Sequence, residues 1–322
     1  MSIDYDSYRH KLIHTPQRQW DVDPTTTVLK TFSEETPTFS IVMPIYNQNS
    51  IIQSVLSSIV LTTVGTYEMI LILDGCTDGS KERVLEWVEM IHFPSTCVRV
   101  HILENPIGIF ETSCDNLGFN LSRGKYIIEI QADMKILTFG YNLLLTTPME
   151  VYPDLFAVSG RCCHALNGLT QTQSVGKLGT LVEKPHPATF ETNAVYLSHT
   201  ANRGPLALRV SMLEEMGYLD EEHYVLGDDD HDLFTRAWVE KKWRTAFVPV
   251  EVYSPLDWGS TRKPMDPNVS SYLMKRKAKE INGYYRQNSA RVLYPKGETR
   301  YMNVSEQLNA RAQLLETKFS SK

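Results

Sequence analysis

Four aspartates are crowded into the run GDDDHDLFTRAW at 227–238. Acids in the first turn of a helix are favoured by the helix dipole and by free backbone N–H groups, so simple capping accounts for one or two of them. Holding Asp228, Asp229, Asp230 and Asp232 together costs repulsion, and repulsion raises the proton affinity of at least one carboxylate. A carboxylate of raised proton affinity suits general-base catalysis, so this run is the first candidate for chemistry.

A second set of polar residues follows three short apolar runs, FSIVMP, EMILI and KYIIEI. Tyr46 follows the first run, and its ring can stack on a base; Asp74 follows the second, and its carboxylate can accept a hydrogen bond from a pyrimidine N–H. Together they predict a uridine site, although edge packing and turn formation are the simpler roles of such residues. The full set is Pro44, Tyr46, Asn47, Asp74, Gln131, Ala132 and Asp133.

Asp133 is the acid that follows the third run. Mg²⁺ and Mn²⁺ prefer a carboxylate combined with substrate phosphate and water, so Asp133 can hold such an ion against a diphosphate. The ion would offset charge on the departing diphosphate. A helix cap is the alternative role for a single aspartate at a strand end.

The elements that would position these residues alternate along the chain. Apolar runs typical of buried strands are separated by helical patterns, which predicts an α/β fold with a mostly parallel sheet and helices on both faces. In open α/β sheets, ligands bind outside the carboxyl ends of the strands, so the residues that follow the runs should share one crevice. The expected strands are 39–44, 68–74, 98–103, 125–133, 155–160 and 244–248, and the expected helices are 50–62, 78–91, 108–122, 209–216 and 229–241.

Three regions follow from the change of pattern along the chain. Residues 1–37 are polar and interrupted by prolines, so we assign them to an N-terminal extension, and 38–260 form the catalytic domain. Within that domain, 161–205 is loosely patterned, and irregular segments of this length are often functional. Residues 261–322 form a basic, mainly helical C-terminal region.

Composition excludes several classes of protein. The net charge of -6 over 322 residues is mild, which argues against a nucleic-acid partner. Five cysteines without a CxxC pair predict reduced thiols rather than a disulfide framework. The first twenty residues lack the apolar stretch of a signal peptide, and no run approaches the roughly 18 apolar residues of a membrane span, so we expect a cytoplasmic protein.

In segment order the chain resembles the inverting glycosyltransferases of family 2, which have a GT-A fold, a Rossmann-like arrangement. The resemblance covers about 38–260. It rests on SIVMPIYNQ at 40–48, LDGCTDGS at 73–80, NPIG at 105–108, NLGFNLSRGKYI at 116–127, QAD at 131–133 and DDHDLFTRAW at 229–238.

The resemblance implies a metal-dependent enzyme that passes a sugar from a nucleotide diphosphate donor, a UDP-sugar, to a hydroxyl of a glycan, lipid-linked or other acceptor. Asp230 falls where the family has its catalytic base, Asp229 precedes it, and Asp74 falls at the acid that reads uracil. Asp133 falls at the metal-binding acid of the DXD-type motif. Pro44, Tyr46 and Asn47 fall in the nucleotide loop, and Gln131 and Ala132 complete the donor site.

Three positions depart from the family pattern. Gln131 stands where the first DXD acid often is, and Asp115 stands where many members have a basic residue. Where members often supply a histidine ligand, the chain offers Ser254 or Asp257, and the residues do not choose between them. Gln131 and Asp115 favour a catalytically silent sugar-nucleotide-binding module, whereas the intact aspartate run argues against it.

Two further alternatives remain at this point. A sugar nucleotidyltransferase would carry a glycine-rich, basic loop after the first strand, and IYNQNS at 45–50 has neither property. The basic, tyrosine-containing C-terminal region is compatible with peripheral contact at an anionic membrane, and equally with a solvated helix whose apolar side packs on the domain.

Overall fold

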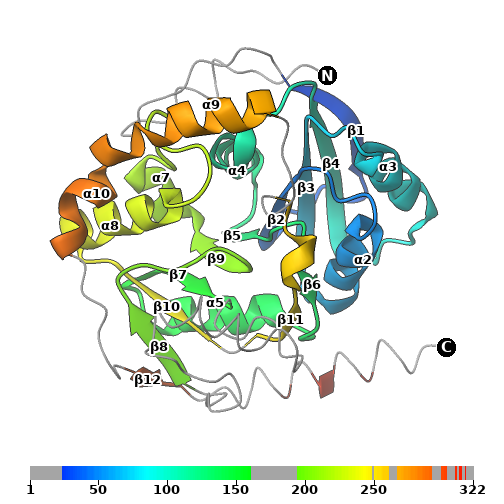
Figure 1. Ribbon diagram of the computed structural model, residues 1–322. Coiled ribbons are helices and arrows are strands. Elements are labelled where there is room, and N and C mark those ends of the chain that lie inside the picture. The colour runs from blue at the N-terminus through cyan, green and yellow to red at the C-terminus, as the bar shows by residue number, and fades with distance from the viewer. Residues whose placement is uncertain are drawn as a thin grey trace.

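The computed structural model describes residues 24–160, 194–248, 250–260, 267–291 and 299–302, together with four separate positions beyond 308. Over these residues one large sheet runs through the molecule with helices on both of its faces (Figure 1). The strand order is β1-β4-β3-β2-β5-β9-β7-β10-β8-β12. The strands are β1 (Thr25–Thr31), β2 (Phe39–Ile45), β3 (Tyr67–Asp74), β4 (Cys97–Asn105), β5 (Tyr126–Glu129), β7 (Leu155–Ser159), β8 (Ala194–Ser198), β9 (Leu206–Arg209), β10 (Arg244–Phe247) and β12 (Thr299–Tyr301).

The sheet is mixed. Its parallel part is the run β4-β3-β2-β5 together with the pair β7 and β10, and the other neighbours are antiparallel. After β2 the chain adds β3 and β4 on one side and then returns to place β5 on the other side of β2. The strand order therefore reverses between β2 and β5, and the carboxyl ends of strands at such a switch point are where open α/β sheets bind ligands.

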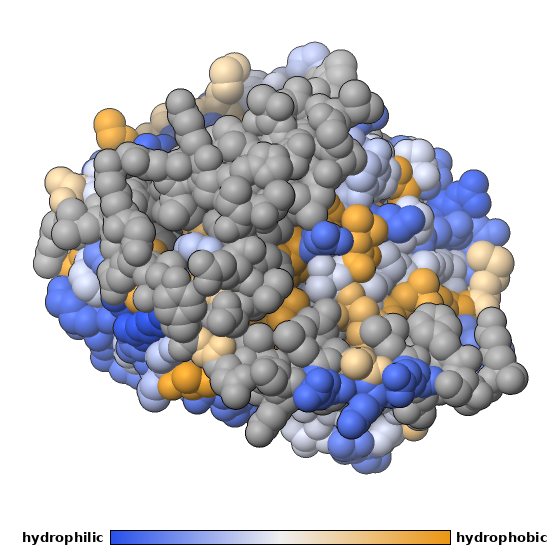
Figure 2. All heavy atoms as spheres, turned by 90° about the horizontal axis from the view of Figure 1, so that it is seen from below, coloured by the Kyte–Doolittle hydropathy of each residue, from blue (hydrophilic) through white to orange (hydrophobic). Residues whose placement is uncertain are grey.

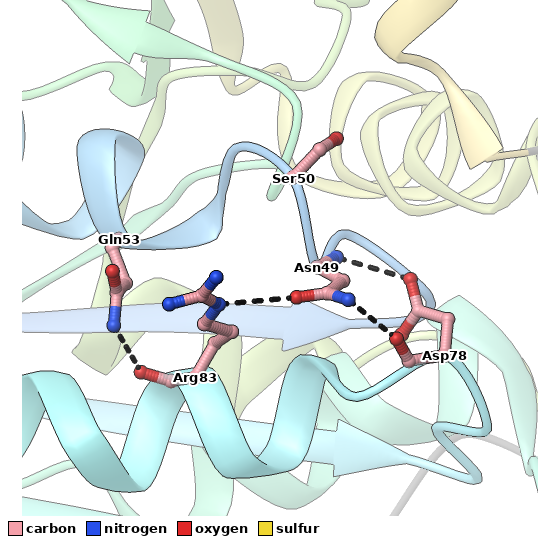
Figure 3. Close-up of a pocket in the computed structure, with 5 residues that line it drawn as sticks. All are labelled: Asn49, Ser50, Gln53, Asp78 and Arg83. Carbon is pink, nitrogen blue, oxygen red and sulfur yellow. Dashed lines mark hydrogen bonds between the residues drawn. The ribbon is translucent and has the colours of Figure 1, made fainter.

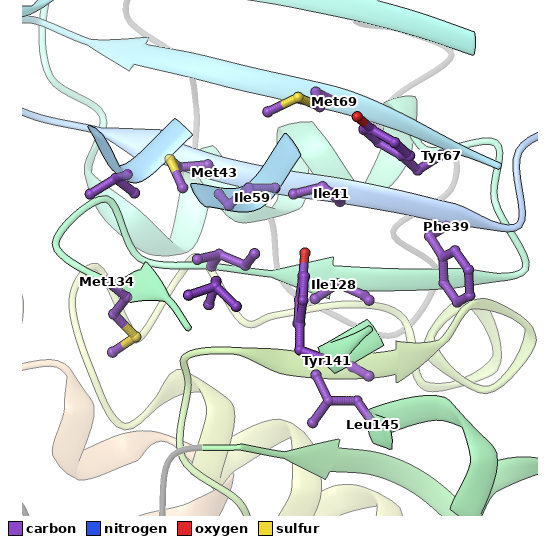
Figure 4. Packing of buried hydrophobic residues seen from close by; sticks show 14 of the residues in the cluster. Phe39, Ile41, Met43, Ile59, Tyr67, Met69, Ile128, Met134, Tyr141 and Leu145 are labelled. Carbon is purple, nitrogen blue, oxygen red and sulfur yellow. The ribbon is translucent and has the colours of Figure 1, made fainter. Parts of the chain in front are cut away.

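The core alternates across the sheet with the period of a strand. Ile41, Met43 and Ile45 of β2 pack on the face covered by α2 (Ile52–Thr62), α3 (Ser80–Met90) and α5 (Tyr141–Val151), whereas Val42 packs on the opposite face. Figure 4 shows Ile41 and Met43 in one cluster with Ile128 of β5 and Tyr141 of α5. The opposite face is covered by α4 (Phe110–Leu121), α7 (Val210–Met216) and α8 (Asp229–Lys241).

Helix α4 lies unusually close to β2. A Cβ built on Gly118, in the middle of α4, would lie 2.3 Å from Cγ1 of Val42. Glycine weakens a helix interior by roughly 0.5–1 kcal/mol, so its presence here is explained by the close packing that a larger residue would prevent. This packing fixes the amino end of α4 at the carboxyl edge of the parallel strands.

A small second sheet lies beside the main one. β6 (Lys135–Ile136) pairs antiparallel with β11 (Val252–Tyr253), with Ile136 opposite Val252. The 3-10 helix η3 (Leu256–Trp258) follows β11. The main strand β5 ends at Glu129, so Gln131–Asp133, which the apolar run had suggested as the end of a strand, form the turn between β5 and β6 instead.

The N-terminal assignment changes in one respect. Residues 25–31 were placed in the extension, but they form β1, an edge strand that pairs antiparallel with β4. The sequence TTTVLKT is rich in β-branched residues, and its polar threonines hide the strand signal because an edge strand is half exposed. Residues 1–23 and 161–193, the latter most of the loosely patterned segment, lie outside the described residues.

The predicted α/β fold with a helical C-terminal region is confirmed. That region contains α9 (Pro267–Lys277) and α10 (Tyr284–Asn288), and α10 docks on α8 through a bond from the Tyr285 backbone N–H to Asp232 Oδ1 at 2.8 Å. Seen from below, the described surface mixes hydrophilic and hydrophobic residues, as solvent-facing surfaces do (Figure 2). Within the described part of the chain, no helix is both long and apolar enough to cross a bilayer.

Candidate functional site

The amino end of α4 is the structural centre of the candidate site. The backbone N–H of Ile109 donates to Asp74 Oδ1 at 2.8 Å, and that of Phe110 donates to Oδ2 at 2.9 Å. Asn105 Nδ2 adds a bond of 3.0 Å to Oδ1. Burial raises the pKa of Asp74 and outweighs these bonds, which act to lower it. Asp74 therefore fixes the approach to α4 as well as lying at the end of β3.

The next two residues of α4 contact two other predicted segments. Glu111 Oε1 accepts a bond of 3.0 Å from Gln131 Nε2, in the turn that also contains Asp133. Thr112 Oγ1 donates to Asp229 Oδ2 at 2.6 Å. Four consecutive residues, 109–112, thus connect the ends of β3 and β5 with the start of α8.

A buried arginine lies among the acids at this junction. Arg203, just before β9, pairs with Glu111 at 3.0 Å, Asp115 at 2.8 Å and Asp229 at 2.5 Å. Its backbone N–H donates to Asp230 Oδ2 at 3.2 Å. Arg203 was not among the predicted site residues because it lies in the loosely patterned segment. The Gly-Pro pair that directly follows it is the one distinctive signal near it.

Asp229 and Asp230 are adjacent and buried but have opposite electrostatic situations. Burial raises the pKa of Asp229 to about 6, with Asp230 and Glu111 adding to the shift and Arg203 opposing it. For Asp230, burial also acts upward, but His231 and Arg203 outweigh it and hold its pKa well below the ordinary range. His231 Nδ1 lies 2.9 Å from Asp230 Oδ1. Asp230 is thus ionised, and the raised proton affinity expected of the aspartate run falls on Asp229 and not on Asp230.

The other two aspartates of the run serve the packing of the C-terminal region. Asp232 accepts bonds from Tyr224 Oη at 2.9 Å and from the Tyr285 N–H, and it pairs with Arg236 at 3.0 Å. Asp228 pairs with Arg286 of α10. Capping by a side chain, the simple explanation of the run, is absent at Asp228, the residue that precedes α8.

The loop after β2 is held by neighbours on two sides. The Thr77 N–H donates to Asn47 Oδ1 at 2.9 Å, and Asn47 has a positive φ of 50°. Gln48 Nε2 donates to the carbonyl of Trp258 in η3 at 3.0 Å. Tyr46 is half-buried in this loop, whereas Pro44, also half-buried, lies within β2 opposite Ile72 of β3. The loop is therefore attached both to the segment after β3 and to the segment after β11.

A surface hollow of about 420 Å³ lies next to this loop, lined by Asn49, Ser50, Gln53, Asp78 and Arg83 (Figure 3). Its polar groups bond one another: Arg83 Nε donates to Asn49 Oδ1 at 3.3 Å, and the Asn49 N–H donates to Asp78 Oδ2 at 3.0 Å. These contacts brace the loop. None of the residues predicted for the site lines this hollow.

Oxygen ligands for a cation occur in two places. Asp133, half-buried, lies two residues before Lys135 of β6, and Ser254 directly follows Tyr253 of β11, the pairing partner of Lys135. Ser254 is buried and its Oγ has no hydrogen-bond partner among the described residues, whereas Asp257 is exposed. Separately, Glu111, Asp115 and Glu129 offer carboxylate oxygens within 4.8 Å of one another, but Arg203 already pairs with two of them.

Part of the chain that contains these residues is similar to known proteins. Residues 40–137 match the family described as Glycosyl transferase family 2. The chain is 26% identical over 131 residues to the "Uncharacterized glycosyltransferase YibD" of Escherichia coli strain K12. That match covers 41% of this chain and 36% of the relative, so it spans only about a third of the relative's length.

Two solved structures share the fold. One is a mannosyltransferase from Pyrobaculum calidifontis in complex with GDP-Man and Mn²⁺, with a TM-score of 0.51, 14% identity and coverage of 97% of this chain and 87% of that one. The other is GalNAc-T7 with UDP, GalNAc and Mn²⁺, with a TM-score of 0.51, 14% identity and coverage of 87% and 55%. At this identity the likeness concerns the fold alone. The chain thus has a GT-A fold, and the loops after β2, β3 and β5 lie inside the segment, residues 40–137, that matches Glycosyl transferase family 2.

Proposed function

We propose that this protein transfers a sugar from a nucleoside diphosphate donor, a UDP-sugar, to an acceptor hydroxyl with inversion at the anomeric carbon. The observation that carries the proposal is the set of contacts at 109–112, which join the end of β3, the turn after β5 and the start of α8. A base-reading acid, a metal-binding acid and a proton acceptor would have to meet in this way for glycosyl transfer.

The donor would lie across the carboxyl ends of β2, β3 and β5. Tyr46 offers a ring for stacking on the base. Asp74 already accepts bonds from Asn105 and the α4 backbone, with a further side-chain bond from Cys114, so a pyrimidine N–H would share the carboxylate with these donors. Because the existing bonds fix the carboxylate, Asp74 would meet the base without losing side-chain freedom.

The residues near Asp133 fit a divalent cation. A carboxylate and the Ser254 hydroxyl are hard oxygen donors, which is the ligand type that Mg²⁺ and Mn²⁺ prefer. Ser254 Oγ, buried without a hydrogen-bond partner among the described residues, is a polar atom that an ion would satisfy. We therefore propose Asp133 as the metal ligand with Ser254 rather than the exposed Asp257 as its companion. A bound ion would offset the charge on the departing diphosphate.

The transfer itself would use Asp230. Its carboxylate accepts the proton of the acceptor hydroxyl while that oxygen forms a bond to the anomeric carbon, and the bond from this carbon to the diphosphate breaks on the opposite face. Products are the glycoside, the nucleoside diphosphate and a protonated Asp230 that returns its proton to water. His231 and Arg203 hold Asp230 ionised before the reaction.

A donor panel tests the proposal. Purified protein is incubated with UDP-, GDP- and ADP-sugars, with Mn²⁺ or with a chelator, and release of the nucleoside diphosphate is measured by coupled assay. We expect Mn²⁺-dependent hydrolysis or transfer from a UDP-sugar. Tight binding without turnover of any donor would instead favour a silent sugar-nucleotide-binding module. The absence of both binding and turnover would refute the proposal.

We also propose that the C-terminal region contacts an anionic membrane surface. Met274 and Ile281 are 71% and 73% exposed and lie seven residues apart, with Lys275, Lys277 and Lys279 exposed around them. Apolar side chains framed by lysines suit the interface of an anionic bilayer. Cosedimentation with phosphatidylserine vesicles should exceed that with phosphatidylcholine vesicles and fall in Met274→Ser/Ile281→Ser. Equal sedimentation with both lipids would refute this contact.

A further inference from the structure

We infer that Arg203 is a positioning residue that holds Asp229 and Asp230 in place and couples them to the donor loop containing Gln131. This inference rests on the proposed function, but the contacts of Arg203 exist without any substrate. Arg203 lies between the two predicted halves of the site, beside the direct bond from Thr112 to Asp229.

The turn that carries Arg203 is packed against the donor loop. Gly204 has a φ of +81°, a conformation that favours glycine, and a Cβ built on it would lie 2.4 Å from Met134 Sδ. The same Cβ would lie 3.4 Å from Gln131 Oε1. The backbone next to Arg203 therefore rests directly on the segment that flanks Asp133.

The side chain of Arg203 extends this contact to the start of α8. Gln131 bonds Glu111 at 3.0 Å, Glu111 pairs with Arg203 at 3.0 Å, and Arg203 pairs with Asp229 at 2.5 Å. The Arg203 backbone N–H bonds the neighbouring Asp230 at 3.2 Å. A displacement of the donor loop would thus be transmitted to both aspartates.

Only a planar fork can make these contacts together. Nη1 of Arg203 pairs with Glu111, while Nη2 pairs with both Asp115 and Asp229. Nη2 also donates a hydrogen bond to Asp229, and the compact ammonium of lysine cannot place its charge near both sets of carboxylates at once. The guanidinium also balances buried carboxylates, and leaving them without a cation would be strongly destabilising.

The charged groups that face the two aspartates come from several elements. α4 contributes Glu111, Asp115 and the Thr112 hydroxyl, α8 contributes His231, and the turn before β9 contributes Arg203, while Glu129 of β5 acts on Asp115. Because Arg203 lowers the pKa of Asp229, Asp230 and Asp115, its removal should raise all three. The acidic limb of the pH–rate profile should then move to higher pH.

The test uses two variants of Arg203 and one control. Arg203→Lys keeps a cation but not the fork, and Arg203→Met/Asp115→Asn removes the cation together with one acid so that the variant can fold. The matched control is Arg236→Lys, another buried arginine, which pairs with Asp232 and donates to the carbonyls of Met216 and Tyr218. Donor turnover is measured from the lowest pH at which the protein stays folded up to pH 9, because the acidic limb set by Asp230 lies below the ordinary range of an aspartate.

We expect kcat of Arg203→Met/Asp115→Asn to fall on the order of 10²-fold, because small misplacements have such effects. Its acidic limb should rise by roughly one to three pH units, the range over which a close cation shifts a carboxyl group. Arg203→Lys should lie between this variant and the wild type. Arg236→Lys should lower the melting temperature but leave the limb unchanged. An unshifted limb in the folded Arg203 variants would overturn the inference.

A second measurement needs no activity and so separates this inference from the proposed function. Urea unfolding of Arg203→Lys, Asp229→Asn and the double variant forms a cycle. Coupled residues should show non-additive changes, by about threefold or more in the unfolding constant. Additive changes would refute the inference about Arg203 even if the protein is an active enzyme. Non-additive changes in a protein that turns over no donor would support the inference and refute the proposed function.

Discussion

The ends of β2 and β3 differ from the start of α8 in how their functional side chains are held. Asp74 is fixed by backbone N–H groups and an amide from the adjoining segment, 31 to 36 residues away. Asp229 is fixed by Thr112 and Arg203, side chains from α4 and from the turn before β9. The first region holds its acid with backbone groups and an amide of the adjoining segment. The second region holds its acid with charged and hydroxyl side chains from several elements.

This difference has an electrostatic consequence. The first region, here called the donor region, consists of the ends of β2 and β3 and the turn after β5. Its acids Asp74 and Asp133 lie singly, one at the end of β3 and one in that turn. The second region crowds Glu111, Asp115 and Asp229 around one guanidinium, and the adjacent Asp229 and Asp230 acquire pKa values shifted in opposite directions. Enzymes commonly separate acid and base roles in this way. Under the proposed function, the donor region would bind the nucleotide sugar and the second region would transfer the proton.

The largest expected effect is that of Asp230→Asn, which would test this division. Asparagine removes proton acceptance but retains one acceptor oxygen, so transfer should fall on the order of 10² to 10⁴-fold while the protein stays folded. Steady-state kinetics with a UDP-sugar measures the effect. Asp228→Asn is the matched control, because Asp228 pairs with Arg286 on α10, and it should change the rate only mildly. A near wild-type rate for Asp230→Asn would move the base to another residue.

Asp232 should affect stability instead of rate. It is fully buried and binds Arg236, Tyr224 and the Tyr285 backbone. Asp232→Ala leaves the Arg236 charge buried and unpaired, which should lower the free energy of unfolding by about 3–5 kcal/mol. Urea denaturation gives this value. A loss below about 1 kcal/mol would mean that Asp232 does not anchor α10 as described.

The sequence predicted the donor region better than the second region, for a physical reason. Apolar runs such as EMILI predict a buried strand. Asp74, two residues after this run, must then lie at the carboxyl edge of the sheet. The aspartate run also announced α8. Arg203 could not be predicted, since its role depends on acids that lie 26 to 92 positions away in the chain and meet only in the folded protein.

Two other features escaped for related reasons. The strand β1 has alternating half-exposed positions and no continuous apolar run, so it was assigned to the extension. Ser254 and Asp257 differ only in the folded protein, where Ser254, directly after the strand β11 that pairs with β6, is buried and Asp257 is exposed. In both cases the missing information was the identity of the neighbouring strand, which single-chain patterns do not specify.

The pH dependence of stability should identify Asp229. Its pKa is raised in the folded protein, from 3.8 to about 6, so the folded state binds the proton more tightly than the unfolded chain. The stability that Asp229 contributes is therefore complete at low pH and is lost as pH rises through this window. Asp229→Asn should lose less stability than the wild type between pH 4.5 and pH 7 in urea titrations. Parallel curves would contradict the assignment.

The smallest expected effect concerns the base. Asp74 would add one bond to uracil while remaining bound by its present donors, so UDP should bind only a few-fold more tightly than ADP or GDP in the presence of Mn²⁺, about 1 kcal/mol for one hydrogen bond. Competition calorimetry with the three nucleotides measures the preference. Equal affinities would assign Asp74 to the α4 junction alone and leave base recognition to other groups.

The most direct test of the division between binding and proton transfer is a calorimetric comparison of two variants. UDP is titrated into Asp133→Ala and Asp230→Asn with and without Mn²⁺, beside the wild type and Gln131→Ala. We predict that Asp133→Ala loses the Mn²⁺-dependent part of the affinity, that Gln131→Ala loses less of it, and that Asp230→Asn stays within a few-fold of the wild type. Full Mn²⁺-dependent affinity in Asp133→Ala, or its loss in Asp230→Asn, would contradict the account.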